Sequence, residues 1–409
     1  MLNIIWVSFF LIAFLVALLQ WLVWGQGDVF VSIMGATFEM SRVAFEIALG
    51  LVGIMSFWMG IMRIGERAGV LDLFVRLLHP LLRKLFPEVP ERHPAFGAMV
   101  MNFSANLLGL DNAATPLGLK AMNELQALNP EKHSATNAQI LFLVLNTSSV
   151  TLFPVTVFVY RAQQGAADPT DVFLPILLAT FCSTLVGLLA VAAVQRISMN
   201  DPVLLAYLGG LTALMGGLVW YFSQLDQAAM QEQSARLSNF LLFTVIVAFM
   251  ATALWKKQNV FDVFIDGAKE GFEVAIKIVP YLVAMLVGIA VFRASGALEI
   301  LLDGIRWLVL GVGGDTRFVD ALPTAFMKPL SGSGARGMMI ETMQTFGADS
   351  FAGRMASVMQ GSTETTFYVL ALYFGAVGVR RTRHALPCAL LADAAGILAA
   401  ILVSYWFFG

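Results

Sequence analysis

The chain has 409 residues, of which 58% are hydrophobic and 13% charged, and its formal net charge is −2. Soluble domains average about 45–50% apolar and roughly 25% charged residues, so this composition excludes a soluble protein and predicts an all-α integral membrane protein. No tract rich in Lys and Arg is present, so we expect the lipid bilayer as a partner and no nucleic acid.

Apolar stretches long enough to cross a bilayer alternate with polar loops along the chain. We expect spans at residues 1–24, 42–64, 137–160, 172–195, 203–222, 238–255, 271–292, 352–376 and 385–408. The first stretch lacks a basic n-region and a small-residue cleavage site, which favours a retained helix over a signal peptide. The stretches 203–222 and 238–255 have few polar atoms and are expected to be scaffold helices, which leaves open a homodimer face.

Four further stretches do not fit simple spans. Residues 71–86 and 297–312 are amphipathic, which is typical of helices that lie along the membrane surface. Residues 94–128 and 321–347 are interrupted by polar side chains, glycine and proline, so each is predicted to form a re-entrant hairpin of two short helices. The expected hairpin tips are residues 109–116 and 331–337.

The two halves of the chain share this order of elements. Phe45-Glu46-x-Ala48 aligns with Phe272-Glu273-x-Ala275, and Ser148-Ser149-x-Thr151 aligns with Ser362-Thr363-x-Thr365. The predicted organisation is therefore a repeat at 1–200, a linking helix and outer loop at 201–237, and a second repeat at 238–409. An odd number of crossings separates the repeat starts, so we expect two inverted-topology repeats with broken transmembrane helices.

Basic residues predict the orientation, because loops rich in Lys and Arg stay in the cytoplasm. The 64–93 loop and the basic residues at 196, 256–257 and 380–383 should lie there. The expected location is a bacterial cytoplasmic (inner) membrane, with the N-terminus in the cytoplasm and the C-terminus outside.

Two polar runs interrupt predicted spans at matching places, Asn146 to Thr151 and Gln360 to Thr366. Polar groups at membrane depth cost free energy unless they line a cavity or meet protein partners. Paired interruptions of this kind indicate a transport site near the bilayer midplane. Alternatively, the hydroxyl groups bond to the preceding turn of their own helix or to neighbouring helices.

The predicted solute- and ion-binding residues come from these runs and from the hairpins. They are Asn102, Asn106, Asp111, Asn112, Thr115, Asn146, Thr147, Ser148, Ser149, Thr151, Ser331, Ser333, Arg336, Gln360, Ser362, Thr363, Glu364 and Thr365. Glu364 is the first choice for an ion ligand or proton carrier, because a carboxylate in a broken mid-membrane segment is costly without such a role. The alternative for Glu364 is a structural ion pair with Arg336 or Lys328.

Other chemistries are not expected. Gly332-x-Gly334-x-x-Gly337 matches the dinucleotide fingerprint by spacing only, since no strand precedes it. No nucleophile–base pair and no set of metal ligands is visible, so we expect neither an enzyme nor a metal or cofactor site. Na⁺ or H⁺ as a coupling ion is the exception.

The two halves of the sequence resemble two bacterial families. Residues 1–200, through Gly109-Leu110-Asp111-Asn112-Ala113-Ala114-Thr115-Pro116, resemble the spore maturation protein A family. Residues from about 238, through Met359-Gln360-Gly361-Ser362-Thr363-Glu364-Thr365-Thr366, resemble the spore maturation protein B family. Both belong to the Gate, or nucleoside recognition, group, which also occurs in concentrative nucleoside transporters. The resemblance implies a membrane protein needed for spore maturation.

Three functions remain open. The favoured one is a transporter that binds a small polar or anionic solute between the inverted repeats. The second is a non-transporting scaffold or sensor of envelope maturation, and the third is a flippase for a lipid-linked precursor.

Overall fold

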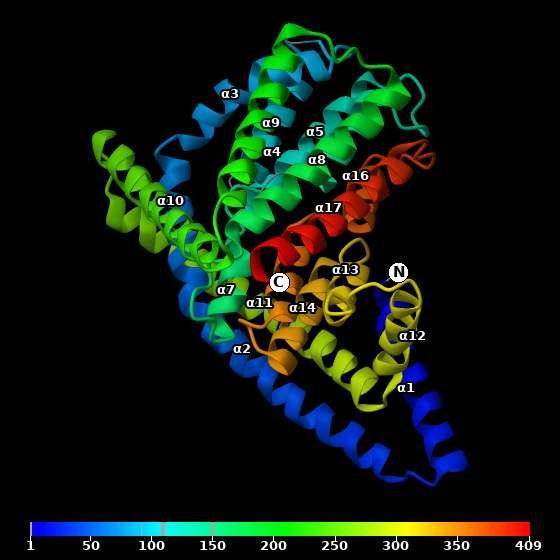
Figure 1. Cartoon of the computed structure of the whole chain (residues 1–409). Helices are drawn as coiled ribbons and strands as arrows, with labels where there is room; N and C mark the ends of the chain where they lie inside the picture. Colours follow the sequence, from blue (N-terminus) through cyan, green and yellow to red (C-terminus); the bar gives the residue numbers. More distant parts are fainter. Residues whose placement is uncertain (1, 91, 108–110, 149–150) are drawn as a thin grey trace. The chain divides into compact units, whose positions relative to one another are not determined.

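The structure of the chain is a computed structural model that describes residues 2–90, 92–107, 111–148 and 151–409, without the side chains of residues 2, 3, 71 and 111–113. Its described residues are almost entirely helical, which confirms the all-α prediction (Figure 1). Seven helices among them are long and apolar enough to cross a membrane.

The first half of the chain contains eight described helices. They are α1 (Leu2–Trp24), α2 (Asp28–Arg67), α3 (Val70–Leu85), α4 (Pro94–Leu107), α5 (Asp111–Leu128), α6 (Asn137–Thr147), α7 (Val155–Gln163) and α8 (Phe173–Gln195). The predicted spans at 1–24 and 172–195 correspond to α1 and α8. The predicted span at 137–160 is divided into α6 and α7, because Pro154 and the polar run interrupt it.

Two helices connect the halves, and a similar series then follows. The connecting helices are α9 (Pro202–Ser223) and α10 (Gln227–Trp255). The series contains α11 (Val260–Ala294), α12 (Ala297–Gly311), the 3₁₀ turn η1 (Val319–Ala321), α13 (Leu322–Met327), α14 (Gly332–Phe346), α15 (Phe351–Gly361), α16 (Thr366–Ala376) and α17 (Ala385–Phe408). The order long helix, amphipathic helix, helix pair, broken helix and final helix thus occurs in both halves.

A left-handed glycine joins the long helix to the amphipathic helix in each half. Gly69 precedes α3 with φ 73°, and Gly296 precedes α12 with φ 76°. Other residues adopt this conformation at a cost, whereas glycine has no Cβ to clash. The alignment of Phe45 with Phe272, continued without a gap, places Gly69 on Gly296, and both positions form the same sharp turn.

Three helices start earlier than their predicted spans. Helix α2 begins at Asp28 rather than near 42, α10 at Gln227 rather than near 238, and α11 at Val260 rather than near 271. Apolar composition detects only the part of a helix that suits lipid, and a polar extension can continue the same helix. For α10 the signal is Asp226, whose side chain accepts a hydrogen bond from the Ala229 amide at 2.8 Å and caps the helix.

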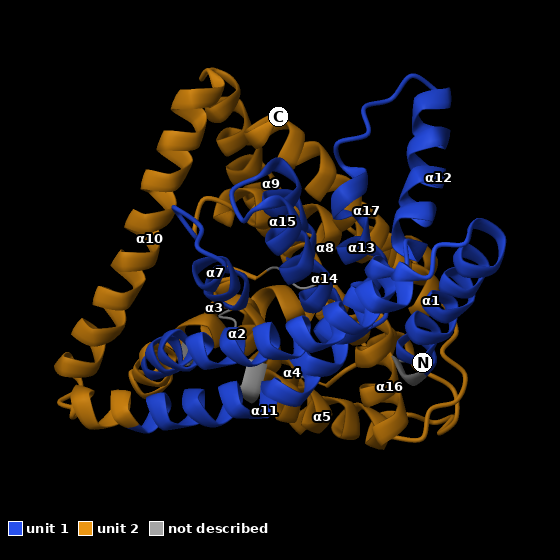
Figure 2. Ribbon diagram, turned by 90° about the horizontal axis from the view of Figure 1, so that it is seen from below, with its two compact units in different colours: residues 1–60, 156–169, 266–360 blue, residues 61–155, 170–265, 361–409 orange. Residues whose placement is uncertain are grey.

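The chain forms two compact units, and both contain segments from both halves (Figure 2). Unit 1 comprises residues 1–60, 156–169 and 266–360. Unit 2 comprises residues 61–155, 170–265 and 361–409. Helix α7 therefore belongs to unit 1, whereas α6, which precedes it in the chain, belongs to unit 2. Helix α16 also belongs to unit 2.

Packing of α8 against α17 forms the centre of unit 2 (Figure 1). Gly187 of α8 faces Ala392 of α17, where an added Cβ would be 3.0 Å from the alanine methyl group. The Ser183 hydroxyl donates to the Ala392 carbonyl oxygen at 2.9 Å. Small residues and interhelical hydrogen bonds are how helices associate in membranes, where no hydrophobic force drives them together.

Candidate functional site

Three asparagine side chains come together in unit 2. Asn102 and Asn106 lie one turn apart on α4, and Asn106 donates from Nδ2 to Oδ1 of Asn146 on α6 at 2.7 Å. Asn102 donates to the carbonyl oxygen of Ala114 in α5 at 2.8 Å and ties the two helices of the first pair together. Asn102 and Asn146 are buried. The structure thus brings together three predicted site residues from two separate stretches.

Tyr373 of α16 completes this cluster, and sequence reasoning missed it. Its hydroxyl donates to Oδ1 of Asn146 at 3.4 Å, and its ring stacks on Phe142 with centroids 5.6 Å apart. Gly118 of α5 leaves room for the hydroxyl, because a Cβ there would be 2.0 Å from it. An isolated tyrosine in an apolar helix has no sequence pattern that distinguishes it from an ordinary packing residue.

The two broken helices meet in unit 2 at the points where α6 ends and α16 begins. The backbone amide of Glu364 donates to the Thr147 carbonyl oxygen at 2.8 Å. This carbonyl belongs to Thr147, the last residue of α6, and carbonyl groups at a helix C-terminus need partners from outside the regular helical pattern. Thr184 of α8 donates its hydroxyl to the neighbouring Ser148 carbonyl oxygen. The two polar runs predicted from the sequence are therefore adjacent.

Most polar side chains around this junction are buried. Thr147, Ser148, Ser362, Thr363, Thr365 and Thr366 are each at most 4% exposed. The hydroxyls of Thr147 and Ser148 donate to the Val144 carbonyl oxygen, at 3.0 and 2.8 Å, so they bond to their own helix.

Two hydroxyl groups at the junction, Oγ1 of Thr363 and Oγ1 of Thr366, have no hydrogen-bond partner among the described residues. A buried polar group in this state costs about 1–3 kcal/mol. Both lie at the start of α16, and the Thr365 side chain does not cap that helix. A helix N-terminus presents free amide groups and the positive end of the helix dipole. The junction therefore combines unused donors from backbone and side chains.

Glu364 differs from its neighbours because its side chain is exposed. Within the described residues it forms no ion pair. Its two predicted alternative partners, Arg336 and Lys328, belong to unit 1. A second carboxylate of unit 2, Asp393 of α17, is buried at 2% exposure and lies one turn before Gly396, which contacts Thr363.

Four predicted residues belong to unit 1, namely Ser331, Ser333, Arg336 and Gln360. Ser331 caps α14 by accepting from the Gly334 amide at 3.0 Å, and its hydroxyl lies 3.2 Å from that of Ser333. Arg336 of α14 is half-buried. Oε1 of Gln360 is buried and has no hydrogen-bond partner in the described part of the chain. A joint site formed with the tip of the first hairpin stays a prediction.

The remaining predicted residues contribute less. Thr115 and Thr151 are half-buried. Ser149 and the side chains of Asp111 and Asn112 lie outside the described residues.

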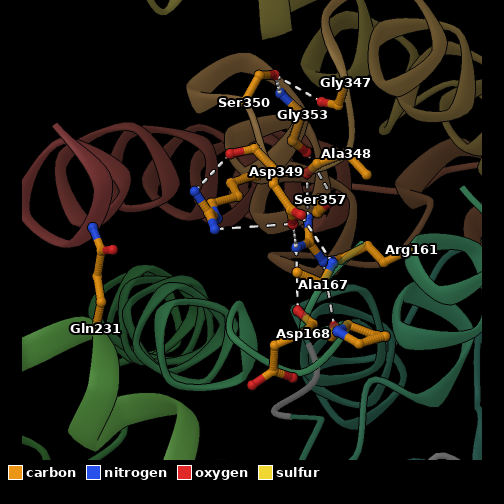
Figure 3. A network of polar contacts seen from close by, with 12 residues as sticks. Arg161, Ala167, Asp168, Gln231, Gly347, Ala348, Asp349, Ser350, Gly353 and Ser357 are labelled. Atoms are coloured by element: carbon orange, nitrogen blue, oxygen red, sulfur yellow. Dashed lines mark hydrogen bonds and ion pairs between the residues drawn. The ribbon is translucent and has the colours of Figure 1, made fainter. Parts of the chain in front are cut away.

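Sequence reasoning also missed Arg161, the centre of a polar network in unit 1 (Figure 3). Its fully buried guanidinium donates to the Ala348 carbonyl oxygen at 2.8 Å and pairs with Asp349 at 3.2 Å. Asp349 also accepts from the Ala167 amide at 2.8 Å. This network connects α7 and the loop after it to the turn between α14 and α15.

Comparisons with known proteins agree with the sequence resemblance. The Gate family, described as nucleoside recognition, matches the chain twice, at residues 48–163 and 275–380. Spore maturation protein A of Bacillus subtilis (strain 168) is 40% identical over 183 residues, which are 45% of this chain and 90% of that protein. Spore maturation protein B of the same organism is 43% identical over 173 residues, which are 42% of this chain and 96% of that protein. No solved structure matches.

Proposed function

Because this chain is a multi-pass membrane protein that belongs to the Gate, or nucleoside recognition, family, we propose that it transports a small polar or anionic solute across the bacterial inner membrane. The proposal includes two inverted repeats with re-entrant hairpins, a cytoplasmic N-terminus and an outer C-terminus. A coupling ion, Na⁺ or H⁺, accompanies the solute.

The observation that carries this proposal is the junction of the broken helices. Thr363 and Thr366 are buried with unused hydroxyl groups beside the uncapped start of α16. Amide and hydroxyl donors together suit an anionic or strongly polar group of a solute. The last carbonyls of α6 face the same junction, since the Thr147 carbonyl reaches the Glu364 amide. Carbonyl oxygens at a broken helix suit a cation.

Glu364 is the candidate for ion coupling. Its carboxylate is exposed and unpaired within the described residues, although its backbone amide is anchored at the junction. A carboxylate in this position can take up a proton or contact Na⁺ without breaking a structural ion pair. The Asn102–Asn106–Asn146 cluster with Tyr373 supplies further polar groups from α4, α6 and α16 of the same unit.

Uptake into proteoliposomes tests the proposal, with labelled nucleosides and nucleoside monophosphates as the first probes under a sodium gradient or a pH gradient. Thr363→Val and Thr366→Val should each reduce uptake at least about tenfold, because each removes a donor worth about 1.5 kcal/mol or more to a charged group. The matched control is Thr180→Val, since the buried Thr180 hydroxyl already donates to its own helix at Leu177.

Glu364→Gln separates coupling from binding. We expect it to abolish accumulation against a gradient while solute binding and the folded state persist. Uptake of every probe at the level of empty liposomes by the wild-type protein, or unchanged uptake in all three variants, would contradict transport at this junction.

A further inference from the structure

The two halves of the chain complete each other's compact units. Unit 2 contains α4, α5, α6 and α8 of the first half together with α16 and α17 of the second. Unit 1 contains α1 and α7 of the first half together with α11 to α15 of the second. We propose that residues 1–224 and 225–409 are obligate partners, so that they bind each other one to one even when the connection between α9 and α10 is cut.

In unit 2, contacts between the halves include the polar core. The Tyr373 hydroxyl occupies the space left by Gly118 and reaches Asn146, and the Glu364 amide bonds to the Thr147 carbonyl. Removal of the second half would leave Asn146 without its tyrosine partner. The candidate site would then lack half of its groups.

A second connection in unit 2 lies at the far end of the same helices. Ser134, between α5 and α6, and Arg381, between α16 and α17, form a parallel β-bridge. The Ala135 amide donates to the Arg381 carbonyl at 3.0 Å, and the Arg380 and Arg381 amides both donate to the His133 carbonyl. The Ala135 bond in particular specifies a partner segment, because Ala135 is buried and a buried amide left unpaired is costly.

Unit 1 is completed in the reciprocal way. Arg161, in the second part of the first broken helix, is enclosed by Ala348 and Asp349 of the second half (Figure 3). Trp6 of α1 donates to the Ala284 carbonyl of α11 at 2.8 Å, and Gln20 donates to the Ser295 carbonyl at 2.8 Å. An isolated second half would expose these acceptors. In an isolated first half the Arg161 guanidinium would keep the carbonyl oxygens of Asp168 and Pro169 but lose Ala348 and Asp349.

The relatives indicate which kind of protein each half would bind. The spore maturation proteins A and B are separate proteins of which this chain covers 90% and 96%, and each matches less than half of this chain. Their sequences resemble the first and second halves described here. Two separate proteins with these folds would form the same two units only by association, so the fused chain is an A-type protein covalently joined to its B-type partner.

The test uses the purified full chain with a protease site placed at residues 224–226, between the end of α9 and the start of α10. We expect the two halves to remain together at a one-to-one ratio in mild detergent after cleavage and to separate only in SDS. Halves that separate on size exclusion, with each remaining helical and monodisperse, would overturn the proposal.

Two variants show whether the association uses the contacts described. In a background with Cys182→Ala and Cys388→Ala, the pair Ser134→Cys and Arg381→Cys should form a disulfide on oxidation and join the cleaved halves on a non-reducing SDS gel, because bridge partners lie close enough. Each cysteine alone is the control. Absence of the joined band in the folded, cleaved protein would contradict the exchange of segments.

Gly118→Ala tests the buried contact. Its Cβ would displace Tyr373, so dissociation of the cleaved halves at a given detergent strength should increase about tenfold. Gly97→Ala on α4 is the matched control, since an added Cβ there meets nothing within 4 Å. Equal effects of the two substitutions would argue against α16 as the element that joins the halves.

Discussion

Nδ2 of Asn106 lies 2.7 Å from Oδ1 of Asn146, and this hydrogen bond joins α4 to α6. The same Asn146 oxygen accepts from Tyr373 of α16. The buried Asn146 side chain thereby connects three helices. Two of them, α4 and α6, belong to the first half of the chain, and α16 belongs to the second. Such a cluster has large energetic effects when one member is removed, because the remaining polar groups cannot reach water.

Asn146→Leu should therefore lower the free energy of unfolding by about 1–3 kcal/mol, since Asn106 and Tyr373 would lose their acceptor. Thermal or denaturant unfolding in detergent measures the change. Asn123→Leu is the control, because Asn123 is exposed and bonds only to the Leu119 carbonyl of its own helix. Equal stabilities of the two variants would show that the asparagine cluster carries no net energy.

Arg161→Met should destabilise the protein by about 1–3 kcal/mol, because it removes a buried donor from the Ala348 carbonyl oxygen and one ion-pair partner from Asp349, whose carboxylate is partly exposed and keeps the Ala167 amide. Arg236→Met provides the comparison. Arg236 pairs with Glu232 while 75% exposed, and an exposed pair contributes at most about 1 kcal/mol. If Arg161→Met lowered the free energy of unfolding by less than about 1 kcal/mol, the network in Figure 3 would not hold α7 in place.

Gly396→Ala should disturb the junction, because Gly396 of α17 packs against Thr363. The added Cβ would be 2.6 Å from Cγ2 of Thr363 and 3.0 Å from Cβ of Ser183, and overpacking of this kind costs about 1–3 kcal/mol. Solute binding should weaken with it, because Thr363 must move. Gly216→Ala on α9 meets nothing within 4 Å and should be neutral or more stable by up to about 1 kcal/mol. Solute titrations measure the change in binding, and melting curves measure the change in stability, for Gly396→Ala and Gly216→Ala.

The contact between Gln195 and His384 should make stability depend on pH. Burial, and secondarily the charge of Arg383, lower the pKa of His384 below its ordinary value of 6.5. Gln195 Nε2 lies 3.0 Å from His384 Nε2, so the amide donates to the neutral ring. A depressed pKa gives stability that is present above pH 6.5 and is lost as pH falls through the pKa of the folded state.

Melting temperatures between pH 8 and pH 5 measure this effect. The His384→Gln variant should lose part of the acid-induced decrease seen in the wild-type protein. Parallel pH profiles for the two proteins would show that His384 does not titrate differently in the folded and unfolded states.

Much of the candidate site could be recognised from local sequence. Polar runs inside apolar spans locate the breaks after Thr147 and Gly361, and the spacing of Asn102 and Asn106 predicts a shared face of one helix. These features depend on neighbouring residues only, and the free energy of a polar group in lipid makes them conspicuous. The left-handed turns at Gly69 and Gly296 fall on positions that the internal alignment pairs, and both turns use glycine because it has no Cβ.

Tyr373 and Arg161 could not be recognised in this way. Their roles depend on partners more than 180 residues away, as with Asn146 for the tyrosine and Asp349 for the arginine. Composition and periodicity describe how one segment meets lipid, whereas the choice of a partner helix depends on shape, small residues and hydrogen bonds that only packing reveals.

The amino-acid sequence by itself thus indicated the helical membrane architecture and the position of both breaks, because lipid penalises each exposed polar group locally. Only the tertiary structure decided that α7 joins unit 1 and α16 joins unit 2, and that the amide of Glu364 reaches Thr147. Those outcomes depend on which distant surfaces fit together, and no single segment contains that information.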